Sequence, residues 1–272
     1  MPDVVCYYPE NTPTWRLSRK CPVAVTTKKG KNMHSPARAG ARIREMFAII
    51  APRYDFLNRL LSLGIDNRWR RAAVERILCP DGGTVLDIAT GTGDMVLAAA
   101  AGTNDSVRLV GTDFCSEMVE IARSKISGSR YGSRISLAVA SCEELPFRDA
   151  FFDAATIAFG IRNVEDREIG LREICRVLKP GGRLVVLEFS TPRSAFFRPL
   201  YSLYLRRLLP AVGGLFSNFT AYSYLPESVR AFPGREAFEK LMQAAGFAHT
   251  CHVDLSFGIV TVFQGEKPFT SP

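Results

Sequence analysis

The sequence lacks several features that would assign it to a familiar class of protein. It contains no run of 18 apolar residues, which a membrane-spanning helix requires. Its seven cysteines include no Cys-x-x-Cys pair, and several lie in apolar segments, which favours reduced thiols and a cytoplasmic protein. Histidine is scarce, and although His249, Cys251 and His252 are close in sequence, the alternation of a strand would point them to opposite faces. We therefore expect no metal site.

Charge is distributed unevenly, because residues 11–44 carry nine Lys and Arg residues and no acidic residue. This composition predicts that residues 1–42 form a basic, disordered arm, an organelle leader, an arm on the membrane surface, or the translation of a misassigned start. Beyond residue 44 the chain has 26 basic and 25 acidic residues. Because this body is nearly neutral, it lacks the basic footprint that binds a phosphate backbone, and we expect no nucleic acid partner.

Short apolar strands alternate with helices from about residue 43, which is typical of a doubly wound, mostly parallel sheet covered on both faces. The pattern predicts an α/β domain over residues 43–267, with N-terminal helices before the sheet and a short tail at 268–272. Helices are expected at 43–63, 67–78, 94–101, 116–127, 166–178 and 234–245. Strands are expected at 84–88, 107–112, 134–140, 152–159 and 183–189, followed by a hairpin over 249–265.

A nucleoside site is predicted where the first two strands end. Asp87 lies in the first strand, the glycines Gly91 and Gly93 follow it, and Asp113 ends the second strand. Ligands of such sheets bind at the carboxyl ends of the strands, glycines let the backbone approach a ligand, and a carboxylate can bind a ribose diol. A dinucleotide site would carry a third glycine where this chain has Val96, so NAD and FAD are disfavoured.

An acidic residue, an apolar pair and Gly-x-Gly resemble the first motif of the S-adenosylmethionine (SAM)-dependent methyltransferases. Longer segments over residues 43–267 resemble, more specifically, the ubiquinone/menaquinone biosynthesis C-methyltransferase family. These segments are 53–58 (Arg-Tyr-Asp-Phe-Leu-Asn), 62–65, 68–70, 145–147 (Leu-Pro-Phe), 159–163 (Phe-Gly-Ile-Arg-Asn), 176–182 and 187–190.

The resemblance implies a seven-stranded Rossmann-like methyltransferase fold, SAM as cofactor, and methyl transfer to a ring carbon of a polyprenyl hydroquinone. That acceptor is demethylmenaquinol or the matching ubiquinol precursor. The family's cofactor contacts fall on Thr92, Asp113 and the pair Ser141-Cys142, beside Asp87, Gly91 and Gly93. The chain departs from the family at Ser141, where Asn or Asp is usual and only a hydroxyl is present, and at Ala158, where the family carries a serine.

The chemistry of the acceptor singles out Arg162 as the first catalytic candidate. A ring carbon attacks well when its phenol ionises, and a guanidinium stabilises a phenolate without acting as a base. Asn163 would orient the second oxygen. The alternative for Arg162 is a structural ion pair with Glu165 or Asp166. Glu188 and Asp94 are candidates to accept the ring proton, and each has an alternative structural interpretation.

Residues 195–219 are apolar around most of a helical wheel, which predicts a lid over the polyprenyl quinol that touches the inner face of the cytoplasmic membrane. A plain core helix is the alternative. Tyr222 and Tyr224 are candidates to line the ring pocket or to pack. A small-molecule O- or N-methyltransferase and a SAM-binding module without turnover remain open as functions. The sequence also leaves open whether the acceptor is a naphthoquinone or a benzoquinone, how long the tail of the acceptor is, and which oligomeric state the protein adopts.

Overall fold

The structure is a computed structural model of the 272-residue chain, and it describes residues 36–62, 64–193 and 219–269. Most of the predicted arm and nearly all of the predicted lid lie outside these residues, as does the side chain of Tyr222. Helix α1 (Pro36–Ile50) begins ahead of the predicted domain start at residue 43. Its first residues are a proline and a series of alanines and arginines, which suit a helix start and a helix interior.

Within the described residues, seven strands form one sheet in the order β3-β2-β1-β4-β5-β7-β6. Strands β1 to β5 are parallel to one another, and β7 is antiparallel to both β5 and β6. This confirms the predicted doubly wound α/β fold with a terminal hairpin. The strands are β1 (Thr84–Ile88), β2 (Arg108–Asp113), β3 (Ile135–Val139), β4 (Phe152–Ala158), β5 (Leu178–Phe189), β6 (Ala248–Leu255) and β7 (Val260–Glu266).

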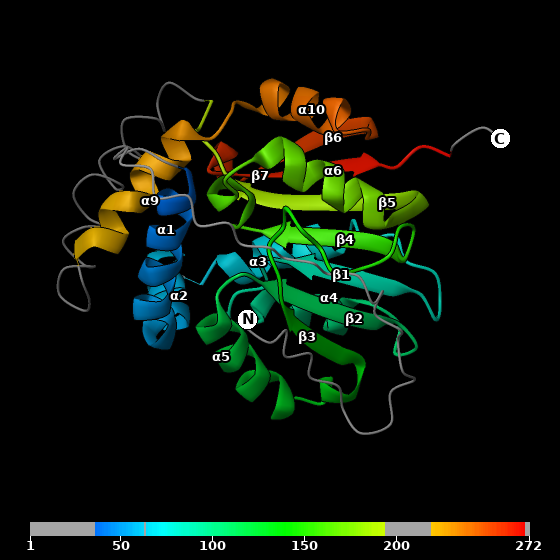
Figure 1. Cartoon of the computed structure of the whole chain (residues 1–272), viewed down its shortest axis with the longest axis horizontal. Coiled ribbons are helices and arrows are strands. Elements are labelled where there is room, and N and C mark those ends of the chain that lie inside the picture. Colours follow the sequence, from blue (N-terminus) through cyan, green and yellow to red (C-terminus); the bar gives the residue numbers. More distant parts are fainter. Residues whose placement is uncertain (1–35, 63, 194–218, 270–272) are drawn as a thin grey trace.

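Helices cover both faces of the sheet and one of its ends. Side chains of α6 and α10 pack on one face, and side chains of α3, α4 and α5 pack on the other. Helices α1, α2 and α9 lie at the end where the parallel strands finish (Figure 1). The remaining helices are α2 (Tyr54–Ser62), α3 (Asp66–Val74), α4 (Asp94–Gly102), α5 (Ser116–Ser127), α6 (Arg167–Val177), α9 (Phe219–Ala231) and α10 (Arg235–Ala244).

Several predicted elements differ from the structure: the helix expected over 67–78 ends at Val74, and α9 has no counterpart among the expected helices. The helix expected over residues 43–63 is divided by the 3₁₀ turn η1 (Ala51–Arg53), because Pro52 has no N–H to continue the α-helical hydrogen bonds. Strand β5 begins at Leu178 rather than at residue 183, so residues 179–182, which lie between the expected helix and the expected strand, belong to the strand. Gly181 there has φ +78°, a conformation that favours glycine.

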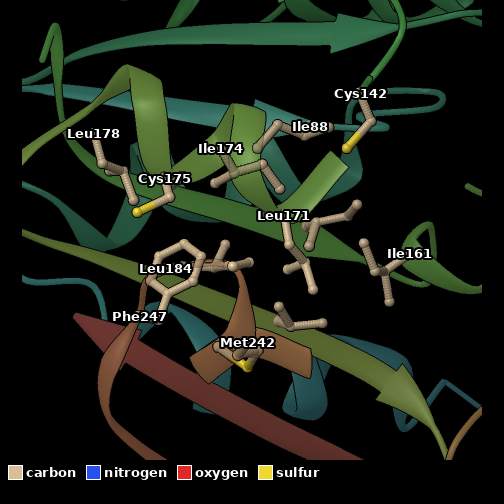
Figure 2. Close-up of a cluster of buried hydrophobic side chains, with 14 of the residues drawn as sticks. Ile88, Cys142, Ile161, Leu171, Ile174, Cys175, Leu178, Leu184, Met242 and Phe247 are labelled. Carbon is tan, nitrogen blue, oxygen red and sulfur yellow. The ribbon is translucent and has the colours of Figure 1, made fainter. Parts of the chain in front are cut away.

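The core between the sheet and α6 joins distant parts of the chain (Figure 2). Leu171 and Ile174 of α6 meet Ile88 of β1, Leu184 of β5 and Met242 of α10, and all five side chains are almost fully buried. Close packing of this kind allows little movement of the elements. The strand ends of β1, β4 and β5 are therefore a rigid base for the loops that follow them.

Candidate active site

The loops after β1 and β4 approach each other closely at the carboxyl edge of the sheet. Ala89 and Phe159 follow these strands with φ of 51° and 55°, which non-glycine residues rarely adopt. A Cβ atom added to Gly160 would lie 2.5 Å from the Cβ of Ala89. Only glycine fits at residue 160 while alanine occupies residue 89. Unusual backbone conformations of this kind cluster at functional sites.

Asp113 holds the glycine loop after β1. Its carboxylate accepts hydrogen bonds from the backbone N–H of Gly91 and of Cys115, both at 2.9 Å. Burial raises the pKa of Asp113 to about 6, although these backbone donors oppose the shift. A Cβ atom added to Gly91 would meet no atom within 4 Å, so open space lies beside the loop. The carboxylate and the open backbone are thus neighbours, as the sequence predicts for a ligand site.

Asp87 of β1 contacts one threonine just after its own strand and another in β4. Its carboxylate accepts hydrogen bonds from the hydroxyls of Thr90, at 2.6 Å, and Thr156, at 2.7 Å. Burial raises the pKa of Asp87 to about 6 against these two hydrogen bonds. Asp87 therefore supports the start of the glycine loop from inside the sheet.

Thr92, in the same loop, is tied to helix α2. Its hydroxyl donates to Asp55, whose second carboxylate oxygen pairs with Lys125 of α5. Lys125 also donates to Asp94 at 2.7 Å, and Asp94 pairs with Arg70 of α3. Sequence reasoning assigned no role to Asp55 or Lys125. The family-like segment at 53–58 marks the neighbourhood of Asp55, but no spacing in the sequence connects it with Thr92.

The predicted pair Ser141-Cys142 divides between two environments. The Ser141 hydroxyl donates to Glu143 and accepts from the Glu143 backbone N–H, which forms a small turn after β3. The Cys142 side chain points into the core beside Ile88 (Figure 2), and burial raises the pKa of its thiol to about 12. Any contact of Cys142 with a ligand at the edge therefore falls to its backbone.

Arg162 is buried at the end of β4 and pairs with Glu188 at the end of β5. Its Nη1 atom donates to Glu188 at 2.6 Å and to the carbonyl of Phe159 at 2.5 Å. Glu188 also accepts from the backbone N–H groups of Arg162 and Phe189. The structural partner of Arg162 is thus Glu188, and not Glu165 or Asp166. Within the described part of the chain, Nε of Arg162 is buried and has no hydrogen-bond partner.

Two tyrosines, Tyr54 and Tyr224, and the asparagine Asn163 lie near Arg162. Burial raises the pKa of Tyr54 and of Tyr224, although the charge of Arg162 opposes both shifts. Burial opposes the charge on Arg162 itself, but Glu188 and Tyr54 outweigh it and raise the pKa of Arg162. The Tyr224 hydroxyl donates to Oδ1 of Asn163 at 2.9 Å. The site therefore combines a fixed cation with two neutral hydroxyls at the edge that carries Asp113.

Other sequence candidates lie elsewhere or are engaged. His252 contacts Glu239, and Cys251 accepts a hydrogen bond from Gln264, on the far edge of the sheet. In the described ranges there is no group of three potential metal-binding side chains. No helix there is both long and apolar enough to cross a membrane.

Known proteins resemble this chain over most of its length. A model of the ubiE/COQ5 methyltransferase family matches residues 36–267. The chain belongs to the ubiE/COQ5 methyltransferase family. The ubiquinone/menaquinone biosynthesis C-methyltransferase UbiE of Geobacter sulfurreducens is 57% identical over 235 residues, which are 86% of this chain and 92% of that protein. Demethylmenaquinone methyltransferase of Thermus thermophilus is 49% identical over 224 residues, which are 82% of this chain and 100% of that protein.

Solved structures share the fold of this ubiE/COQ5 methyltransferase family member at low identity. A SAM-dependent methyltransferase from Thermotoga maritima superposes with a TM-score of 0.57 at 22% identity, covering 82% of this chain and 99% of that chain. The [4+2]-cyclase SpnF superposes with a TM-score of 0.63 at 18% identity, covering 84% of this chain and 96% of that chain. These likenesses establish the Rossmann-like architecture, and the chemistry has to be argued from the site.

The buried Asp87 carboxylate generates a pH-dependent prediction. Its pKa of about 6 lies above the ordinary value of 3.8, so its contribution to stability is full below about pH 4 and is lost as the pH rises through 6. The variant Asp87→Asn cannot ionise there. Its free energy of unfolding relative to the wild type should therefore increase by about 2 to 3 kcal/mol between pH 4 and pH 7 and stay constant above. Urea unfolding across this range measures it, and a difference independent of pH would contradict the account.

Proposed function

We propose that the protein transfers a methyl group from SAM to a ring carbon of a polyprenyl hydroquinone in quinone biosynthesis. Two relatives of high identity are named for this chemistry, one as a ubiquinone/menaquinone biosynthesis C-methyltransferase and one as a demethylmenaquinone methyltransferase. The observation that carries the proposal is the meeting of the Asp113 loop and the Arg162 group at one edge of the sheet. A methyl donor and a phenol bound there would lie next to each other.

The cofactor residues suit SAM. Asp113 would accept hydrogen bonds from the ribose diol, and the open backbone at Gly91 leaves room for the ligand. Gly93, Thr92, Ser141 and the backbone of Cys142 complete the proposed site, with Asp87 supporting it. SAM, when bound, supplies an electrophilic methyl group.

Arg162 would lower the pKa of the acceptor phenol. A phenol titrates near 10, so at neutral pH the site has to stabilise the phenolate that develops as the ring attacks. Glu188 neutralises much of the charge of Arg162, and Nε, which has no partner in the described ranges, remains as a buried donor. Tyr54 and Tyr224 stay neutral because burial raises the pKa of each, and since Tyr224 already donates to Asn163, Tyr54 is the hydroxyl that would donate to the acceptor. The free amide N–H₂ of Asn163 would orient the second ring oxygen.

Glu188 and Asp94 are less suited to accept the ring proton. Glu188 already accepts three hydrogen bonds, two of them from Arg162. Asp94 pairs with Lys125 and Arg70. We assign Glu188 to holding Arg162 in place and Asp94 to the ionic contacts beside the glycine loop.

The substrate's tail determines the proposed location. A polyprenyl chain partitions into the bilayer, so we propose peripheral contact with the inner face of the cytoplasmic membrane. The basic residues at 11–44 and the apolar residues at 195–219 are the segments expected to make it.

The proposed function predicts a specific metabolic lesion. Cells of the source organism that lack this gene should accumulate a quinone that is one methyl group lighter, and the intact gene should restore the methylated form. Mass spectrometry of extracted quinones measures this and distinguishes a naphthoquinone from a benzoquinone acceptor. An unchanged quinone profile would exclude the proposal and favour another acceptor.

Asp113 should determine SAM affinity. Because a hydrogen bond to a charged group contributes about 1.5 to 3 kcal/mol, Asp113→Ala should weaken SAM binding roughly 10- to 150-fold. Asp105→Ala is the matched control, since Asp105 is an exposed acid just before the same strand, β2. Calorimetry measures both, with circular dichroism to verify folding. Equal affinities in folded proteins would exclude Asp113 from the cofactor site.

Arg162 should act on the acceptor and not on the cofactor. Arg162→Lys keeps the charge but loses the planar donor group, so methylation should fall while SAM affinity is retained. Arg162→Ala should lose more, roughly 2.7 to 4 kcal/mol of barrier, as for a lost oxyanion donor. Its rate should recover partly towards pH 10, where the free phenol ionises. Parallel pH profiles with a lowered melting temperature would instead assign Arg162 to the fold.

A further inference from the structure

Two consecutive residues of α2 reach the two halves of the site. Asp55 accepts the hydrogen bond of Thr92 in the glycine loop. Tyr54, the residue before it in α2, lies near enough to Arg162 for the charge of that arginine to oppose the rise in the Tyr54 pKa. Successive side chains of a helix diverge by about 100°, so one helical turn can contact both groups at once. Fixing one of these residues orients the other, because the helix moves as a unit.

The contacts of Asp55 place α2 against the elements that build the glycine loop. Lys125 of α5 joins Asp55 to Asp94, the first residue of α4, which directly follows the loop. Arg70 of α3 pairs with Asp94 and also with the buried Asp66. Thr92 is only 2% exposed, so its hydroxyl has little access to water as an alternative acceptor to Asp55.

We propose that Asp55 is a positioning residue that makes the acceptor side of the site depend on the glycine loop. Its carboxylate fixes α2 on Thr92 and Lys125, and α2 in turn holds Tyr54 beside Arg162. The inference rests on the proposed function, since it assigns the glycine loop to SAM and Arg162 to the quinol. It adds that the loop, once filled, orders the helix that completes the quinol site.

A purely structural role for Asp55 predicts a different outcome. The side chains of Asp55 and Lys125 are 30% and 28% exposed, and ion pairs in contact with water contribute little to stability. Removal of the Asp55 carboxylate should therefore cost little through the ion pair, so a purely structural role would show as a lower melting temperature, from the unsatisfied Thr92 hydroxyl, with unchanged kinetics. Lys125 keeps Asp94 as a partner, so no charge is left unpaired.

Kinetics of three variants test the proposal. With SAM saturating, Asp55→Ala should lower kcat/KM for the quinol about 10- to 100-fold, through both a higher KM and a lower kcat. Asp55→Asn retains an oxygen that can accept from Thr92 and should fall between Asp55→Ala and the wild type. Glu120→Gln is the control, since it removes an exposed carboxylate that pairs with Arg123 on α5. If Asp55→Ala equals this control, or loses only thermal stability, the proposal is overturned.

A double-mutant cycle supplies the readout that a structural role would not change. Tyr54→Phe should lower kcat/KM in the wild type but add little in Asp55→Ala, because Tyr54 is no longer held in place. Additive losses would overturn the proposal.

Hydrogen exchange separates this proposal from the proposed function. SAM should slow amide exchange over residues 54–62 in the wild type and not in Asp55→Ala. If the wild type methylates no quinol, the proposed function fails, yet this protection would still support the link to Asp55. Equal protection in both proteins would overturn the link even in an active enzyme.

Discussion

The hydrogen bonds from the Gly91 and Cys115 amides to the Asp113 carboxylate are the contacts on which the rest of the site depends. They fix the loop after β1 against the end of β2, so that the carboxylate and the open backbone face the same space. Thr92 then occupies the position from which it reaches Asp55 on α2. Through one turn of helix this order extends to Tyr54 and Arg162. The proposed cofactor and acceptor halves therefore share one mechanical support.

The Arg162 and Glu188 pair is maintained for its geometry more than for stability. Both side chains are nearly or fully buried, and the desolvation of two charges commonly equals or exceeds their attraction. Among the residues that the structure describes, Nε of Arg162 nevertheless has no hydrogen-bond partner, which is costly unless a ligand uses it. A buried donor that the described residues do not satisfy is understandable where a phenolate oxygen develops during the reaction. The same reasoning explains the strained backbone of Phe159, whose carbonyl binds Arg162.

Much of the fold follows from the sequence pattern, because strand periodicity and turn residues act locally. The succession of strands and helices along the chain, the edge that carries Asp113 and the terminal hairpin are predictable in this way, whereas the spatial order of the strands comes from the structure. The contacts within the site are not, since Asp55 lies 37 residues from Thr92 and 70 from Lys125 in sequence. Arg162 illustrates the limit: acids at 165 and 166 are near it in sequence, but Glu188 meets it through pairing of β4 with β5.

The central claim is that the acceptor atom is a ring carbon, and isotope transfer tests it most directly. The purified protein would be incubated with SAM carrying a ¹³C-labelled methyl group and a reduced demethyl polyprenyl quinone, and the product analysed by NMR spectroscopy. The account predicts a labelled methyl signal that is bonded to a ring carbon. A labelled methyl bonded to oxygen, in the product of the same enzyme, would contradict it and identify an O-methyltransferase on this fold.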